Sequence, residues 1–208
     1  MALLGAGLSA PAGGGASPFR SVSSGTQASG AIYNFPLPTT KQAGDLILVW
    51  VVYDASGFNG LVTPIGWTQV AIRTASVQCG AVLFSKVSDG TETTVGLTQT
   101  ASTFLEAHSV VTVGSKTVEA NNTNISTAAN SINSVSLTSG GADRTRVDFW
   151  SAYTATTVTL PAAQTAATTP TSRAAVGYRT VGSGATGLET AGFSTSPSSG
   201  VTIGALLA

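Results

Sequence analysis

Few side chains in this sequence are able to do chemistry, and they are widely spaced. His108 is the only histidine and Cys79 the only cysteine, so a zinc site would take most of its ligands from carboxylates, and no His/Cys spacing typical of zinc is present. A nucleophilic triad would need His108 as its base, yet serine and threonine are abundant throughout the chain and not only around it. We therefore expect no metal, no cofactor and no catalytic residue.

Carboxylates are the other candidates for catalysis. A glycosidase needs two of them about 5 to 10 Å apart, and four residues qualify by type alone: Asp45, Asp54, Glu106 and Asp148. Asp45 directly follows Gly44 at the start of an apolar run, where an aspartate usually stabilises a turn. No helical pattern follows the glycines at 13–15 or 140–141, which argues against a phosphate-binding loop. The sequence thus predicts a protein that is not an enzyme.

Aromatic residues offer the most site-like feature, the stretch Thr63-Pro64-Ile65-Gly66-Trp67, with Phe58 in the loop before it. Exposed aromatic rings on a β-sandwich stack on sugars or anchor protein interfaces. Trp67 is explained better as a side chain that closes one end of the sandwich. Phe58 and Trp67 are therefore our candidate surface contacts.

The element that must position these residues is the apolar run at 46–53, which follows a Gly-Asp turn. Its length and its β-branched and aromatic content predict a central strand buried on both faces. One row of side chains would be Leu46, Leu48, Trp50 and Val52, and the other Ile47, Val49, Val51 and Tyr53. A two-sheet sandwich covers one row, so the chain's own arm, a loop or another subunit must cover the second. We interpret this requirement as a sign of assembly.

Composition narrows the functional class further. The 208 residues suit one large domain, and only 9% of them are charged, against a usual value of about 25%. Nine basic residues balance nine acidic ones without a basic run, so we expect no nucleic acid partner. Cys79 is best explained as a small buried apolar residue. The run at 46–53 is too short to span a bilayer as a helix, and we expect no membrane role.

Residues 1–30 are rich in Gly, Ala, Ser and Pro and cannot form a core of their own. We predict an extended N-terminal arm, folded back on its own domain or docked on a neighbouring subunit. Its apolar side chains, the candidate interface anchors, are Leu3, Leu4, Leu8 and Phe19.

Residues 31–208 form the predicted β-sandwich domain, because their pattern is β throughout. Expected strands lie at 32–37, 46–53, 67–72, 77–87, 93–98, 104–113 and 201–207. In the strand at 104–113, His108 belongs to the row that we expect to face away from the core, as an exposed residue. The Asn- and Thr-rich stretch at 115–130 is predicted to be a loop between two halves.

The second half repeats the first weakly. Trp50 and Tyr53 recur as Trp150 and Tyr153, and Phe84 and Val87 recur as Tyr178 and Val181. Two four-strand units of this kind predict an antiparallel, jelly-roll-like or Greek-key β-sandwich with internal duplication.

A sequence resemblance adds to this interpretation. The motifs Gly44-Asp45-Leu46, then Pro64-Ile65-Gly66-Trp67-Thr68, then Lys86-Val87 ahead of Gly90 resemble a recurrent β-sandwich pattern of bacteriophage virion proteins, and the resemblance extends loosely over 31–208. It implies a structural role in capsid decoration or in a tail or fibre, and it carries no catalytic residues.

Two functional hypotheses follow. The first is a non-enzymatic capsid decoration or cement protein, a trimer in the virion, assembled in the bacterial host cytoplasm. Its partner would be the major capsid protein or another virion protein, which it would grip through the arm at 1–30. The second is a tail or fibre module that binds a host surface carbohydrate or receptor through Trp67 and Phe58.

Overall fold

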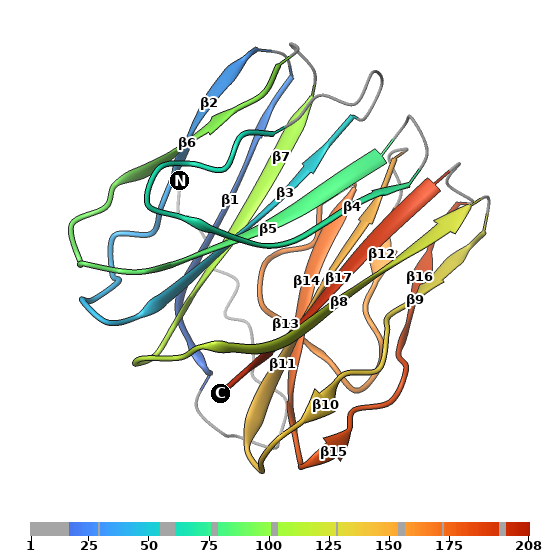
Figure 1. The fold of residues 1–208 in the computed structure, drawn as a ribbon. Helices are drawn as coiled ribbons and strands as arrows, with labels where there is room; N and C mark the ends of the chain where they lie inside the picture. The colour runs from blue at the N-terminus through green and yellow to red at the C-terminus, as the bar shows by residue number, and fades with distance from the viewer. Residues whose placement is uncertain are drawn as a thin grey trace, which may run out of the picture.

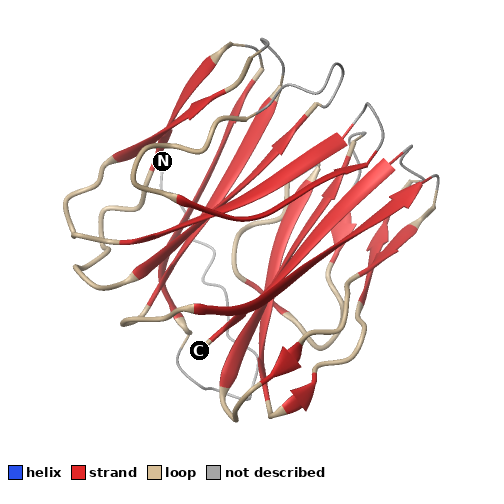
Figure 2. Cartoon of the chain, viewed as in Figure 1, coloured by secondary structure: helices blue, strands red, loops and turns tan. Residues whose placement is uncertain are grey.

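The computed structural model describes residues 17–28, 30–54, 61–75, 79–100, 104–127, 129–153, 157–171, 173–195 and 199–208. These residues form 17 strands and no helix, which confirms the predicted all-β class (Figure 2). Within the same ranges, no helix meets the length and hydropathy needed to span a membrane.

Two five-stranded antiparallel sheets make up most of the molecule. The first has the order β1 (Phe19–Gln27), β7 (Leu105–Thr112), β3 (Leu46–Tyr53), β5 (Cys79–Val87) and β4 (Thr68–Ala75). The second has the order β13 (Thr165–Ala166), β14 (Ala174–Val181), β11 (Arg144–Ala152), β17 (Ser199–Leu207) and β8 (Val118–Thr127). Figure 1 shows the first half of the chain, in blue to green, beside the second half, in yellow to red.

The main core lies between the two sheets. Leu48, Trp50 and Leu83 project into it from the first sheet and meet Phe149 and Ile203 from the second. The rings of Trp50 and Phe149 lie 5.5 Å apart, so the two sheets interlock at the centre of the molecule. Burial of each large apolar side chain contributes roughly 1.5 to 3 kcal/mol, which makes this core the main source of stability.

Strand β3 is buried along its whole length, as predicted. Its second row packs under a small outer layer made of β2 (Ile32–Pro36) and β6 (Thr94–Thr98), which supplies the side chains of Phe35, Val95 and Leu97. The chain therefore covers both rows with its own segments. The inference from this strand to a second subunit was wrong, because two short strands from the same half serve as the cover.

The second half has an outer layer of its own. Strands β9 (Ser131–Asn133), β16 (Thr190–Phe193) and β12 (Val158–Thr159) form a three-stranded sheet that packs over Trp150 and Ala175 of the second main sheet. A further pair, β10 (Thr138–Ser139) and β15 (Gly184–Ala185), lies at one end of this layer (Figure 1). Each half thus consists of a main sheet and an outer layer, and the two main sheets pack against each other.

The duplication is present in the strand order. Reading β8, β17, β11, β14 and β13 across the second sheet repeats the order β1, β7, β3, β5 and β4 of the first. The matched tryptophans are not equivalent, however, because Trp50 faces the central core and Trp150 faces the outer layer. Phe149 occupies the inward-facing row beside Trp150. The sequence alignment was therefore shifted by one residue, a slip that exchanges the two faces of a strand.

Two segments differ from the prediction in their secondary structure. Val118–Thr127, expected within a loop, forms strand β8 and pairs along most of β17. Phe19–Gln27, expected within the arm, forms edge strand β1 and pairs with β7 at eight positions. Both strands lie at the edge of a sheet. Polar and small residues are enough to form them, because an edge strand pairs through its backbone with one neighbour and packs only one face of its side chains. The sandwich therefore includes residues 19–27.

Candidate functional site

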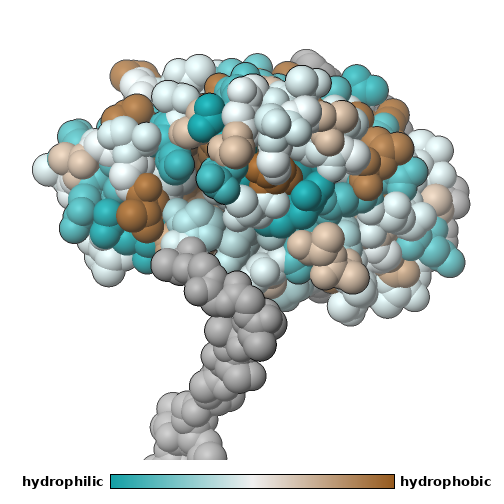
Figure 3. All heavy atoms as spheres, turned by 90° about the horizontal axis from the view of Figure 1, so that it is seen from below, coloured by the Kyte–Doolittle hydropathy of each residue, from teal (hydrophilic) through white to brown (hydrophobic). Residues whose placement is uncertain are grey.

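The most site-like surface of the described chain is a groove of about 500 Å³ beside strand β6. Its lining comes from the turn at 62–67, from strand β6 (Thr94–Thr98), and from Lys86 and Glu92. Elsewhere apolar side chains are scattered, and Figure 3 shows single brown patches among neutral and polar surface on the face that it draws. The groove is the surface where predicted contact residue Trp67 lies.

Local backbone geometry builds the wall of the groove. Gly66 has a φ of 80°, a left-handed conformation that favours glycine, and the Trp67 N–H donates to the Pro64 carbonyl over 3.1 Å. This tight turn leaves Ile65 fully exposed at its tip. Trp67 is half-buried and packs against the cluster beneath β2 and β6. It thus lines the groove and anchors the turn, and its role as a surface contact stays a prediction.

A compensated ion pair lies at the side of the groove. Lys86 Nζ is 2.9 Å from Glu92 Oε1, and Glu92 also accepts hydrogen bonds from the Ser88 hydroxyl and the Asp89 N–H. Partial burial raises the pKa of Glu92, but the hydrogen bonds from Lys86 and Asp89 outweigh it and bring the pKa down to about 2. Glu92 is therefore ionised at neutral pH, already paired, and unsuited to act as a general acid.

The floor of the groove is a strand edge. In the pairing of β6 with β2, the Leu37 N–H donates to Thr93 O and the Gln99 N–H to Ala31 O, so the odd-numbered residues of β6 point their backbone groups toward β2. The backbone groups of Thr94 and Gly96 consequently point toward the groove. In the described ranges this edge makes only one bridge, in which the Val62 N–H donates to Thr98 O over 2.8 Å.

His108 lies in the central core and is completely buried, so the prediction of an exposed residue was wrong. The row that it shares with Glu106 faces the second sheet, because the main core lies on that side of β7. His108 Nε2 is 2.8 Å from Glu106 Oε1, and the Thr171 hydroxyl donates to the same carboxylate. The Thr171 hydroxyl thus bonds the carboxylate of Glu106 and not the imidazole of His108. Both Glu106 and His108 are buried, so a substrate has no access to them. This arrangement joins the sheets and is not a catalytic triad.

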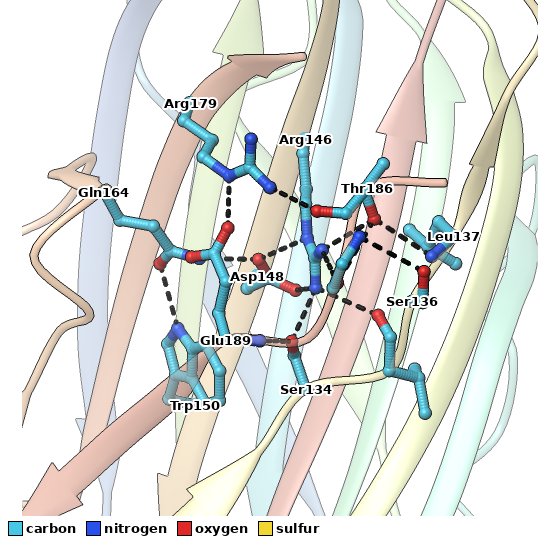
Figure 4. Close-up of polar contacts among 12 residues, drawn as sticks. Ser134, Ser136, Leu137, Arg146, Asp148, Trp150, Gln164, Arg179, Thr186 and Glu189 are labelled. Atoms are coloured by element: carbon cyan, nitrogen blue, oxygen red, sulfur yellow. Dashed lines mark hydrogen bonds and ion pairs between the residues drawn. The ribbon is translucent and has the colours of Figure 1, made fainter. Parts of the chain in front are cut away.

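A second buried polar cluster occupies the outer side of β11 (Figure 4). Arg146 is fully buried and donates to Asp148, to the hydroxyls of Ser134 and Thr186, and to the carbonyls of Val135 and Gly187. These bonds fasten two loops of the outer layer to the main sheet.

Asp148 accepts from Arg146 Nε at 2.8 Å and from Gln164 Nε2 at 2.6 Å, and Gln164 Oε1 in turn accepts from Trp150 Nε1. Burial raises the pKa of Asp148 to about 6, although the charge of Arg146 acts in the opposite direction. Glu189 lies nearby and pairs with Arg179. Both carboxylates are paired with arginines of the second main sheet, Arg146 on β11 and Arg179 on β14, so each has a structural partner.

The other acidic candidates also have structural partners. Asp45 accepts from Arg20 Nε at 2.7 Å, from the Gln42 N–H and from the Gly114 N–H, and so closes the turn before β3 as expected. Asp54 pairs with Arg173 at 3.2 Å. In the described part of the chain, no three His, Cys, Asp or Glu side chains gather as a metal site.

The remaining predicted residues are placed as follows. Leu3, Leu4, Leu8 and Phe58 lie outside the described residues. Phe19, proposed as an arm anchor, is buried in the central core, with its ring 5.0 Å from that of Tyr178. Cys79 is buried as predicted, and burial raises the pKa of its thiol to about 12. Of the predicted contacts, the structure therefore places Trp67 in the groove.

Sequence reasoning missed the strand edge of β6, because an unpaired edge depends on which strands become neighbours. The alternation in Thr94-Val95-Gly96-Leu97-Thr98 marked a half-buried strand but did not reveal its open side. No protein-family model, no curated protein and no solved structure matches this chain.

Proposed function

We propose that this chain is a non-enzymatic structural protein that acts by binding other protein subunits. The observation that supports the proposal best is the groove beside β6, where an exposed apolar turn lies next to unpaired backbone groups. Strand edges with exposed backbone groups are frequent sites of protein association. The ionisable clusters within the described ranges are buried or mutually paired, which fits a structural role.

The narrower proposal is a bacteriophage capsid decoration or cement protein that binds the major capsid protein or another virion protein as a homo-oligomer, with a trimer as the working model. It rests on the resemblance of the Gly44, Gly66 and Lys86 motifs to phage virion sandwiches. In this fold those residues form turns and an ion pair that stabilise the sandwich.

We also propose that each half is a reduced jelly roll. The chain passes from main sheet to outer layer and back, in the sequence β1, β2, β3 and again in β5, β6, β7. This alternation is the pattern of jelly-roll domains, which occur in viral capsid proteins.

Electron microscopy of phage particles that carry this chain, labelled with antibodies raised against it, tests the virion proposal. Regular labelling over the head supports a decoration or cement role. Labelling confined to the tail supports a tail or fibre role instead. Particles that remain unlabelled while the free protein reacts with the antibody would contradict a virion role.

A second candidate function is glycan binding in the same groove. Trp67 provides an aromatic ring on which a sugar can stack, and Thr94, Thr98 and the Lys86–Glu92 pair provide hydroxyl and charged groups in the same groove. Titration of tryptophan fluorescence with host surface polysaccharide tests this function. Saturable quenching that Trp67→Ala abolishes would favour glycan binding, and a flat titration would remove it.

A further inference from the structure

We infer that the groove beside β6 binds an extended strand, and that residues 2–9 of a neighbouring copy of this chain supply it. The inference rests on the proposed assembly function and names the contact that would carry it. The docked segment would lie along Thr94–Thr98 and extend the outer layer of the first half by one strand. It would satisfy backbone groups that the described chain leaves unpaired.

The edge of β6 offers the hydrogen bonds for such a strand. The N–H and C=O groups of Thr94 and Gly96 point into the groove, away from β2. Gly96 has no side chain, and only Asn34 Oδ1, at 3.7 Å, lies near the position of a Cβ there. A backbone can therefore approach this edge closely. Five residues of β6 offer about 17 Å of edge, enough for a strand of similar length.

The second half shows that a strand fits at the equivalent place. There β12 pairs with β16 at two positions, Val158 with Phe193 and Thr159 with Gly192, and it buries Val158 against the main sheet. Among the described residues of the first half, Val62 alone makes the corresponding pairing, after which the chain turns away through Pro64. The outer layer can thus hold a third strand at this edge, and the groove continues the line of that strand.

The sequence of residues 2–9 suits the groove. Leu4, Ala6 and Leu8 alternate with Gly5 and Gly7, so an extended segment would have one apolar row, and its other row would lack side chains at the two glycines. The apolar row would face inward on the same side as Val95, and the glycine row would face outward on the same side as Gly96. The segment has no charged side chain, which suits a groove whose lysine and glutamate already pair with each other.

A neighbouring copy is the better source than the same chain. Ser17 precedes β1, and the Val113 N–H donates to Pro18 O, so the segment leaves from the β1 edge of the first sheet. The groove borders β5, which lies three strands from β1, or about 14 Å across the sheet. The groove also lies one layer above that sheet, or about 10 Å. Eight residues from Ser9 to Ser17 span about 26 Å when fully extended. The packed cluster beneath β2 and β6 fills the straight line between these two places, so the linker would have to follow both legs, about 24 Å in all, which is close to its full length.

Disulfide trapping between full-length chains tests the inference. One chain carries Gly5→Cys or Gly7→Cys, and its partner, distinguished by a size tag, carries Gly96→Cys. Mild oxidation should yield the tagged heterodimer with at least one of the two donors. Cys79 does not compete, because it is buried and burial raises the pKa of its thiol to about 12. The matched control is Asn34→Cys, which faces outward one strand farther from the groove and should give no heterodimer.

The alternation of inward and outward side chains along the docked strand provides the second test. Both substitutions are made in the chain that carries Gly7→Cys. Leu4 belongs to the inward row, so Leu4→Asp should lower the heterodimer yield by about tenfold. Leu3 belongs to the outward row, so Leu3→Asp should change the yield by less than about twofold. Equal effects of both substitutions, or equal trapping by Gly96→Cys and Asn34→Cys, would overturn strand docking.

Two further outcomes separate the alternatives. A single chain with both Gly7→Cys and Gly96→Cys that closes an internal disulfide and stays monomeric would assign the groove to its own segment and overturn the neighbouring copy. Absence of trapping in a chain whose antibody still decorates phage particles would reject strand docking while the proposed structural function stands. Absence of both would reject the two proposals together.

Discussion

At the scale of single residues, the buried polar groups of this protein hold layers together. Arg146 has every hydrogen-bond donor occupied and connects β11 with two loops of the outer layer (Figure 4). Glu106 and His108 connect β7 with Thr171 of the second half. Neither cluster could be predicted from the sequence. Both consist of residues that come together only when the sheets pack, and for His108 the residue row was identified correctly but assigned to the wrong side.

Replacing Arg146 should be costly. We expect Arg146→Met to lower the free energy of unfolding by about 3 to 5 kcal/mol, because it leaves the buried carboxylate of Asp148 without its partner. The double variant Arg146→Met/Asp148→Leu should recover part of this loss. The matched control is Arg144→Met, because Arg144 lies on the same strand and pairs with Glu119. This pair is partly exposed, so its loss should lower the free energy of unfolding by less than about 1 kcal/mol. Urea denaturation measures all three, and equal losses for Arg146 and Arg144 would refute the assignment.

Asp148 should make stability depend on pH. Its pKa is raised by burial to about 6, so the folded protein keeps a proton that the unfolded chain loses near pH 3.8. Between these values unfolding releases a proton, and the contribution of Asp148 to the free energy of unfolding falls as pH rises, by up to about 3 kcal/mol. Urea denaturation from pH 4 to 7 should therefore show a decline in the wild type that is absent in Asp148→Asn. Parallel profiles for the two proteins would contradict a raised pKa.

At the scale of elements, pattern predicted the strongly apolar strands well and the edge strands poorly. Strand β3 was predicted with its bounds and both buried rows, because eight apolar residues leave no alternative. Strands β1 and β8 were assigned to an arm and a loop, since their Ser, Thr, Asn and Gly content resembles a linker. They form strands because β1 pairs with β7 and β8 pairs with β17. In both cases the partner strand is distant in the sequence.

This reassignment changes the expected effect of truncation. Removing residues 1–16 should leave the melting temperature within a few degrees, because β1 and its neighbours remain. Removing residues 1–30 should lower it by about 10 °C or more, since it deletes a strand paired with β7 at eight positions and the buried side chain of Phe19. Thermal melts followed by circular dichroism compare the two. Equal melting temperatures would mean that β1 contributes nothing to the fold.

At the scale of the whole molecule, duplication explains the architecture. Two halves with the same strand order pack main sheet to main sheet, and each covers its outer face with short strands. All-β class and two repeated halves could be predicted from hydrophobic pattern alone. The layered arrangement could not, because the pattern shows that a strand is covered on both faces but not which segment supplies the cover. The groove arises where that cover ends, at the open edge of β6.

Sedimentation velocity of the full-length chain over a wide concentration range tests the central claim most directly, since the claim is that this protein functions by association through the groove. We expect a concentration-dependent oligomer that Ile65→Asp at the exposed tip of the groove shifts toward monomer, while Leu188→Asp, at another exposed apolar position in the second half, leaves it unchanged. A chain that sediments as a monomer at every concentration, or an oligomer indifferent to Ile65→Asp, would contradict the account.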